Sequence, residues 1–232
     1  GQGQYDYMEM VNREPAQHMP DMTSLQGTFY ILGFGGGHWP QVINIWDCGE
    51  DGWDGWGRNL DRLNLKRRKA FYGDWWDEAA QWRTGGFDRV CAGIPESLTT
   101  KQIEERGIKG TLFLNEVLSV QPGRQIEYLN LVVKERSEFM TDHGIVPTGL
   151  WEVINNNHEV VMIWATTIEQ WVTFQKTRDT SLGLDTSGSK DDRILKWERS
   201  ASKFVTSGDT HIMTPLPCLL YTSDAADDRD SV

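Results

Sequence analysis

The fold is decided by the stretch from Gly149 to Trp164, which reads Gly-Leu-Trp-Glu-Val-Ile-Asn-Asn-Asn-His-Glu-Val-Val-Met-Ile-Trp. Three asparagines, which tolerate turn conformations, separate two apolar-rich segments, and this pattern predicts two β-strands joined by a turn. In the second segment both faces are apolar, with Val160, Met162 and Trp164 on one and Val161 and Ile163 on the other. A strand with two apolar faces is predicted to be buried on both sides.

An altered copy of this stretch stands earlier, at residues 30–46. Trp46 and Trp53 match Trp164 and Trp171 at an offset of 118 residues. Four further landmarks match at an offset of 122, namely Trp75 with Trp197, Gly86 with Gly208, Val90 with Ile212 and Pro95 with Pro217. A recurring offset is the signature of an internal repeat, so we predict two related units in tandem.

The second unit, residues 111–217, shows the fuller pattern. We expect a strand at 111–118, a helix at 124–143, the strand pair described above, helices at 167–177 and 192–205 with a mobile loop at 179–191 between them, and a last strand at 211–216. This order, β-α-β-β-α-β, is the ferredoxin-like plan. The fold class is therefore α+β, with two ferredoxin-like units whose sheets pack face to face.

The first unit, residues 1–95, follows the same order from its second strand onward. Strands are expected at 28–34, 41–47 and 87–94, with helices near 52–63 and 71–83, whereas residues 1–26 suggest only a polar, Met-rich remnant of a helix. The first unit is thus predicted to lack its first strand. The resulting open strand edge could recruit another chain, so a homo-oligomer is among the expected assemblies. Residues 96–110 are expected to be a linker.

The last fifteen residues, 218–232, do not continue the pattern. Their start, Cys-Leu-Leu-Tyr-Thr-Ser-Asp-Ala-Ala-Asp, resembles the translation of an adapter used to prepare sequencing libraries. We therefore expect a non-native tail and exclude it from the fold. Without it, the net charge changes from -11 to -8.

Composition excludes some functional classes. A net charge of -11 argues against nucleic-acid binding, which needs concentrated Lys and Arg. We interpret the one basic cluster, at 66–69, as a solvated turn. The chain contains no apolar run of roughly 20 residues, so no membrane contact is expected. Three cysteines without metal-type spacing favour a reducing compartment, and hence the cytoplasm.

The segment 113–129 resembles the start of a NIPSNAP-type domain of the dimeric α/β-barrel superfamily. The matching positions are Glu116, Pro122, Gly123 and Tyr128, whereas Leu118 and Val120 occupy the places of an Arg and a Tyr usual in that strand. The resemblance implies an α/β barrel made from two sheets with helices outside. Members of the superfamily include cofactor-free monooxygenases, lactone isomerases, haem enzymes and proteins of unknown role, so the fold alone does not select an activity.

Glu116 is the candidate catalytic residue. A carboxylate on a central strand must be paired or have its pKa moved, and such groups are over-represented at active sites. The alternative is a structural carboxylate paired with a neighbouring group. Asn115 points to the opposite face of the strand, so the two side chains cannot serve one pocket directly.

Three further side chains are candidates for ligand binding. Most of the eleven tryptophans recur between the units at core positions, so Trp39 and Trp151, which do not recur, are the better candidates for a binding cleft. His143, at the end of the first helix of the second unit, is the third. The histidines do not converge in the pattern, so neither a metal site nor a haem or other cofactor is expected.

Two functions remain open. The chain could bind or convert a small apolar or aromatic molecule, as a cofactor-free oxygenase or isomerase with Glu116 as acid or base. It could instead be a non-catalytic ligand-binding or assembly protein of the same fold. A pocket that reaches Glu116 favours the first, and a space between sheet and helices filled by Trp and Leu favours the second.

Overall fold

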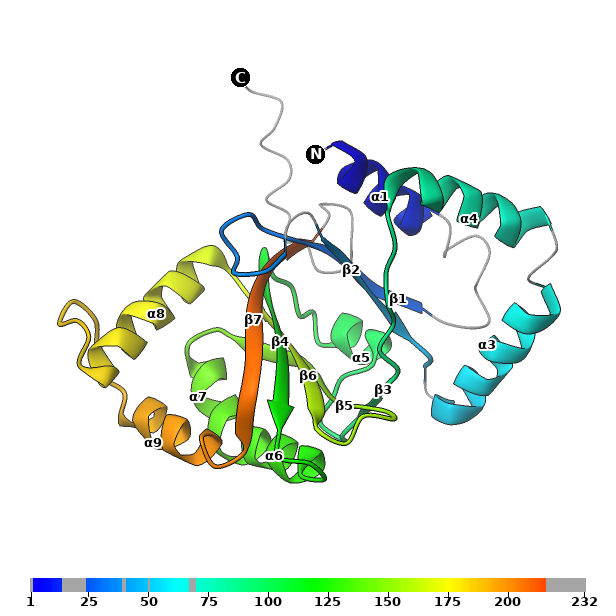
Figure 1. Ribbon diagram of the computed structural model, residues 1–232. Helices are drawn as coiled ribbons and strands as arrows, with labels where there is room; N and C mark the ends of the chain where they lie inside the picture. The colour runs from blue at the N-terminus through cyan, green and yellow to red at the C-terminus, as the bar shows by residue number, and fades with distance from the viewer. Residues whose placement is uncertain (1, 14–23, 39–40, 50, 67–69, 216–232) are drawn as a thin grey trace, which may run out of the picture.

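The computed structural model describes residues 2–13, 24–38, 41–49, 51–66 and 70–215. In this part of the chain helices surround a curled antiparallel sheet, which confirms the predicted α+β class. Figure 1 shows α6, α7, α8 and α9 along one side of the sheet, with α1, α3 and α4 grouped at the other end of the molecule.

The described strands are β1 (Ser24–Ile31), β2 (Val42–Asp47), β3 (Cys91–Gly93), β4 (Leu112–Val120), β5 (Val146–Val153), β6 (Glu159–Thr166) and β7 (Val205–Pro215). The described helices are α1 (Gln2–Arg13), α3 (Gly52–Lys66), α4 (Ala70–Trp82), α5 (Thr100–Glu105), α6 (Gln125–Leu131), the π-helical turn η1 (Val132–Arg136), α7 (Ser137–Asp142), α8 (Ile168–Leu182) and α9 (Asp192–Ala201).

The strands form one sheet in the order β2-β1-β7-β4-β6-β5-β3, and every neighbouring pair is antiparallel. The described residues are thus consistent with the predicted barrel-like α+β fold, but the strands of the two halves form one continuous sheet instead of two sheets packed face to face. Strand edges are the reason, because β1 pairs with β7 and β3 pairs with β5, so strands of the first half satisfy their backbone groups by extending the sheet of the second half. The sheet then curls into a half-barrel.

Residues 112–215 contain the predicted order of strands and helices, with differences at the boundaries. β7 begins at Val205, six residues earlier than expected, because residues 206–210 carry no apolar signal but pair with β4 along its length. The helix before it therefore ends at Ala201. The expected loop at 179–191 is shorter, since α8 continues to Leu182 and is closed by Gly183 in the left-handed conformation.

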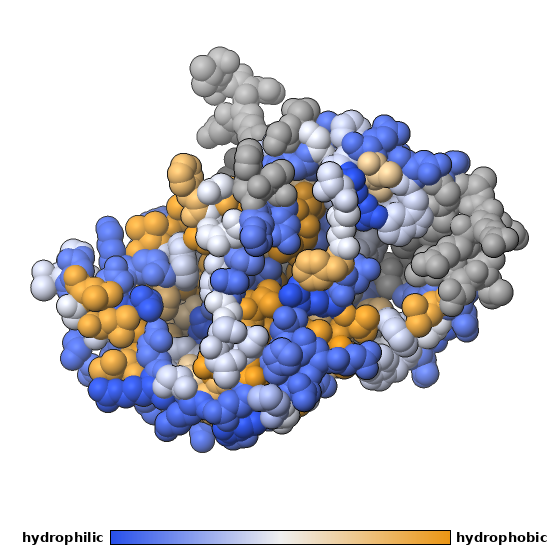
Figure 2. All heavy atoms as spheres, in the orientation of Figure 1, coloured by the Kyte–Doolittle hydropathy of each residue, from blue (hydrophilic) through white to orange (hydrophobic). Residues whose placement is uncertain are grey.

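The convex face of this sheet and its helices enclose the main core. Its members come from strands, helices and the segment before β7, and include Leu114, Tyr128, Leu129, Phe139, Met162, Trp164, Phe174, Trp197 and Phe204. β6 is buried from Val160 to Thr166, which confirms that the strand of the deciding stretch is covered on both faces. In Figure 2 hydrophilic side chains cover the lower rim around α6 and α9, and apolar ones are visible in the middle beside β7.

A second core fills the concave face of the sheet. Phe29 and Ile31 of β1 meet Phe113, Ile163 and Met213 there, and Ile103 of α5 and Leu98, just before that helix, pack against them. The predicted linker at 96–110 thus contains a helix. A capping box starts it, in which Thr99 accepts from the backbone of Gln102 while the Gln102 side chain accepts from the Thr99 backbone.

A third, smaller core lies beneath α1. Tyr7, Met10 and Val11 of this helix pack with Ala79 of α4, and Leu25 and Val42 of the neighbouring strands contact the cluster. The Met-rich segment predicted to be a helical remnant is therefore an amphipathic helix that covers the first-half strands.

The indole of Trp151 lies across the backbone of Gly149 on the same strand. A Cβ added to Gly149 would lie 1.7 Å from Cη2 of Trp151, far closer than two carbons can approach. Trp151 is half-buried and packs against the concave core, so this glycine provides the space in which the indole fits.

We predict that Gly149→Ala lowers the free energy of unfolding by about 2 kcal/mol, because the indole must leave its site or distort β5. Urea denaturation measures the loss. Gly57→Ala is the matched control: Gly57 lies inside α3 with open space around its Cα, so this change should leave stability level or raise it slightly. Equal losses in the two variants would contradict the packing described for Trp151.

Candidate functional site

Glu116 lies on β4 with its side chain directed into the main core. Its side chain is 8% exposed, and that of Arg136, which faces it from η1, is 12% exposed. Nη1 of Arg136 donates to Oε2 of Glu116 at 2.7 Å and Nη2 donates to Oε1 at 2.8 Å, which gives a bidentate ion pair. Nε1 of Trp164 donates to the same Oε2 at 2.8 Å.

The helix opposite β4 contains an irregular turn that places Arg136 against Glu116. Between α6 and α7 the chain makes the π-helical turn Val132–Arg136, a local widening of the helix that is often found at functional positions. The guanidinium carbon of Arg136 lies 4.7 Å from the ring centre of Trp164 and 5.4 Å from that of Trp197. Two indoles and a carboxylate therefore surround the guanidinium.

Electrostatics favour the charged form of the arginine. Burial acts to lower the pKa of Arg136, but the charge and hydrogen bonds of Glu116 raise it, and the net direction is upward. Burial also raises the pKa of Tyr128, whose ring packs against Trp197 and Phe204. The carboxylate of Glu116 is thus paired with the positively charged guanidinium of Arg136, and aromatic rings lie around the pair.

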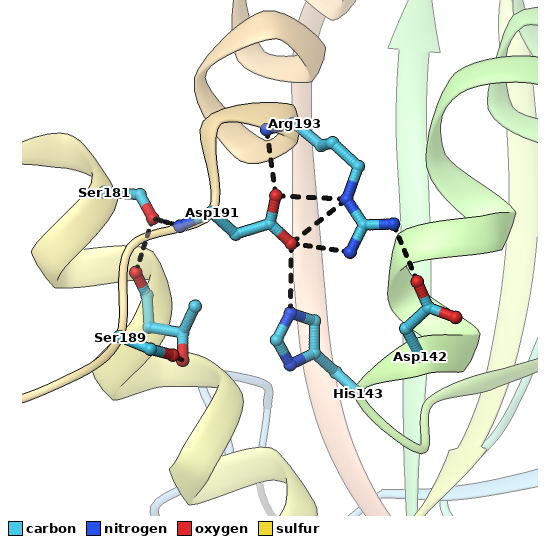
Figure 3. A network of polar contacts seen from close by, with 7 residues as sticks. Asp142, His143, Ser181, Ser189, Asp191 and Arg193 are labelled. Carbon is cyan, nitrogen blue, oxygen red and sulfur yellow. Dashed lines mark hydrogen bonds and ion pairs between the residues drawn. The ribbon is translucent and has the colours of Figure 1, made fainter.

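His143 follows the last residue of α7 and joins a polar network with the start of α9 (Figure 3). Its Nε2 lies 3.3 Å from Oδ2 of Asp191. Arg193 contacts both oxygens of Asp191 through Nε and donates from Nη1 to Oδ2 of Asp142 at 2.7 Å. The ring of His143 also meets the edge of Phe174, at 5.4 Å between ring centres.

Asp191 is the centre of this network. It precedes the first residue of α9 and accepts from the backbone N–H of Arg193 at 3.0 Å, as an N-cap does. The Arg193 side chain, more than any other group, lowers the pKa of Asp191 to about 2. Asp191 is therefore ionised at neutral pH, and it orients His143 and the start of α9.

Short hydrogen bonds tie the loop before Asp191 to α8. Oγ of Ser181 accepts from the backbone N–H of Asp191 at 2.8 Å and donates to the carbonyl of Thr177 at 2.7 Å, and the hydroxyls of Thr177 and Ser189 lie 3.2 Å apart (Figure 3). Hydroxyl groups of α8 therefore hold the segment that was predicted to be a mobile loop. The network joins α7, α8 and α9. These contacts give its residues a structural role.

The predicted site residues do not converge on one place. Glu116 lies inside the main core, His143 lies at the meeting of α7 and α9, and Trp151 packs on the concave side of β5. Trp39 lies outside the described residues. None of the three described candidates lines the open hollow of about 670 Å³ at the turn between β5 and β6, whose lining includes Gln125, Glu152 and residues 153–158.

A polar cluster that was not predicted from the sequence lies beneath α1. Asn44 of β2 donates through Nδ2 to the hydroxyl of Tyr7 at 3.1 Å, and Thr28 is the cross-strand partner of Asn44. Thr28 is fully buried, and its Oγ1 has no hydrogen-bond partner in the described chain, nor has Oδ1 of Asn44. A polar residue at every second position of an otherwise apolar strand was the available signal.

The described residues contain neither a candidate metal cluster nor a candidate membrane-spanning helix. No group of three His, Cys, Asp or Glu side chains there could hold a metal ion. No helix there has both the length and the apolar character needed to cross a membrane.

The network supports a pH prediction. Asp191 has a lower pKa in the folded chain than the ~3.9 of an unfolded chain, so its contribution is complete above about pH 5 and is lost as the pH falls towards 2. Asp191→Asn keeps a good N-cap but removes the charge, and we expect it to lower the free energy of unfolding by about 2 kcal/mol at pH 7.

Urea denaturation at pH 7, 4 and 2.5 checks this prediction, because the gap between wild type and Asp191→Asn should narrow as the pH falls. Asp192→Asn is the control, since this neighbouring carboxylate is 84% exposed and forms a surface ion pair with Lys190. A gap of the same size at pH 7 and pH 2.5 would show that the charge of Asp191 is not what stabilises the network.

No protein-family model and no curated protein matches the chain. Its fold is similar to that of a "putative monooxygenase" from Lactobacillus acidophilus NCFM, with a TM-score of 0.55 and 12% identity over 92% of this chain and 88% of that one. A "putative monooxygenase" from Fusobacterium nucleatum subsp. nucleatum ATCC 25586 is 8% identical, with a TM-score of 0.49 over 91% of this chain and 85% of that one. The likeness to the Lactobacillus protein shows a shared barrel-like α+β fold.

Proposed function

We propose that the chain is a NIPSNAP-like protein of the dimeric α/β-barrel superfamily. It binds a ligand or a protein partner, and its second half does not catalyse a reaction. The observation that carries this proposal is the state of Glu116. Three donors, two from Arg136 and one from Trp164, occupy its carboxylate inside a packed layer.

A general acid or base must come within hydrogen-bond reach of the proton that it moves. Substrate could reach Glu116 only by displacing Arg136 or the indoles above and beside it, and each displacement would leave a buried charge or polar group unpaired. The filled layer of Trp164, Trp197 and Leu114 is the arrangement expected of the binding or assembly protein.

The residues that suggested the family fit this proposal. Pro122 and Gly123 form the turn after β4, where Gly123 takes a positive φ of 77° and its N–H donates to the carbonyl of Asn157. Tyr128 is buried against Trp197 and Phe204. These positions hold the strand, turn and helix together, so their match to a NIPSNAP-type domain reflects the fold.

One observation favours a second candidate, the conversion or binding of a small apolar or aromatic molecule in the first half. Tyr7, Thr28 and Asn44 place two hydroxyls and an amide oxygen close together beneath α1, and Thr28 and Asn44 each keep an unpartnered buried oxygen. Such groups can form hydrogen bonds with a neutral molecule that carries a carbonyl or hydroxyl group.

An oxygen-uptake assay separates the two candidates. We expect the purified chain, mixed with an anthrone or a quinol, to consume oxygen no faster than buffer, and Glu116→Gln to leave that rate unchanged. Uptake that Glu116→Gln abolishes in a folded protein would overturn the proposal. Uptake that survives Glu116→Gln but is lost in Thr28→Val would move the activity to the first half, and circular dichroism controls for folding in each case.

A further inference from the structure

The two halves of the sheet differ by one strand. In the second half the order is β5-β6-β4-β7, so β6 has β5 on one side and β4 on the other. In the first half β1 is followed by β2, and β2 then has no further neighbour among the described residues. β3, at the opposite edge of the sheet, likewise pairs only with β5 in this part of the chain.

The strand order of the second half shows where a further strand would fit in the first half. β1 and β2 take the places of β5 and β6, and β3 takes the place of β7. The strand that would correspond to β4 then belongs between β2 and β3, the two open edges. One strand in that place, antiparallel to both, would close the seven strands into an eight-stranded barrel.

Trp164 and Trp46, which match in the internal repeat, differ in burial and hydrogen bonding, and this difference points to the same open position beside β2. Trp164 on β6 is 0% exposed and donates to Glu116, a residue of β4. Trp46 on β2 is 36% exposed, and its indole has no hydrogen-bond acceptor in the described chain. Trp164 thus takes its acceptor from β4, and the described residues contain no counterpart of β4 beside Trp46.

The burial of β6 and β2 also indicates that β2 has an open edge. β6 is buried at nearly every position, whereas β2 is only half-buried although Ile43 and Ile45 contact the concave core. The end of β2 is held by α5, because Oδ2 of Asp47, the last residue of the strand, accepts from the backbone N–H of Thr100, the first residue of that helix, at 2.7 Å. An edge strand with apolar residues and no charge before its last position is a template for pairing.

We propose that the edges of β2 and β3 form an acceptor slot for one extended strand of a separate polypeptide segment with the chemistry of β4. Such a strand carries apolar side chains at alternate positions and one carboxylate, which would accept the hydrogen bond of the Trp46 indole. This mode is β-strand addition, in which backbone hydrogen bonds give affinity and alternate side chains give specificity. The proposal rests on the proposed binding function and names its partner.

The test uses the full chain and a synthetic peptide of residues 111–120 flanked by lysines for solubility. Hydrogen exchange should slow at the backbone amides of Val42–Asp47 and Cys91–Gly93 when the peptide is added, with exchange in β4 unchanged. No protection at β2 and β3, or increased exchange in β4 because the peptide has displaced it, would overturn the slot. Protection of β2 that rises with protein concentration and without peptide would assign the edge to a second copy.

Matched variants test the carboxylate. A peptide with Glu116→Ala should bind about tenfold more weakly to the wild-type chain, since it lacks the acceptor for Trp46. Trp46→Phe keeps an aromatic side chain but removes the indole N–H, so both peptides should bind this variant equally. Trp53→Phe on α3 is the control and should keep the tenfold difference. Peptide binding is measured without any substrate. A failure of peptide binding therefore does not affect the oxygen-uptake result, and a failure of the oxygen-uptake prediction does not affect the peptide-binding result.

Discussion

The ion pair between Glu116 and Arg136 is the constraint on which the second half of the molecule depends. It joins the central strand β4 to the π-helical turn, and the same carboxylate fixes the indole of Trp164 on β6. A charge buried at this depth is tolerated only when it is paired and hydrogen-bonded, so the helix layer and the sheet must meet in one register. That requirement explains why the indoles of Trp164 and Trp197 lie against the guanidinium of the pair.

Much of the fold could be predicted because the signals were local. The doubly apolar segment Val160–Trp164 indicated a buried central strand, and the order of elements in residues 112–215 followed from apolar spacing and turn residues. The arrangement of the two halves could not be predicted, because edge pairing of β1 with β7 and of β3 with β5 leaves no mark in the side-chain pattern. The helix α5 was missed because six residues give too short a periodic signal.

The candidate site was harder to predict than the fold. A buried glutamate could be expected on β4, but its partner Arg136 is twenty positions away on a helix whose π turn alters the spacing on which such reasoning relies. His143 was selected as a ligand residue, whereas its nearest polar neighbour is Asp191, an N-cap whose role depends on tertiary contact. The polar cluster of Tyr7, Thr28 and Asn44 joins a helix to two strands, and no single stretch of sequence contains that information.

The central claim is that Glu116 acts through Arg136 as part of the fold, and a double-mutant cycle in urea measures it most directly. Glu116→Leu and Arg136→Met alone should each lower the free energy of unfolding by about 3 kcal/mol, because each leaves an unpaired buried charge. The double variant should lose far less than the sum, since no buried charge remains. Additive losses, or single variants as stable as the wild type, would contradict the account and reopen a catalytic role for Glu116.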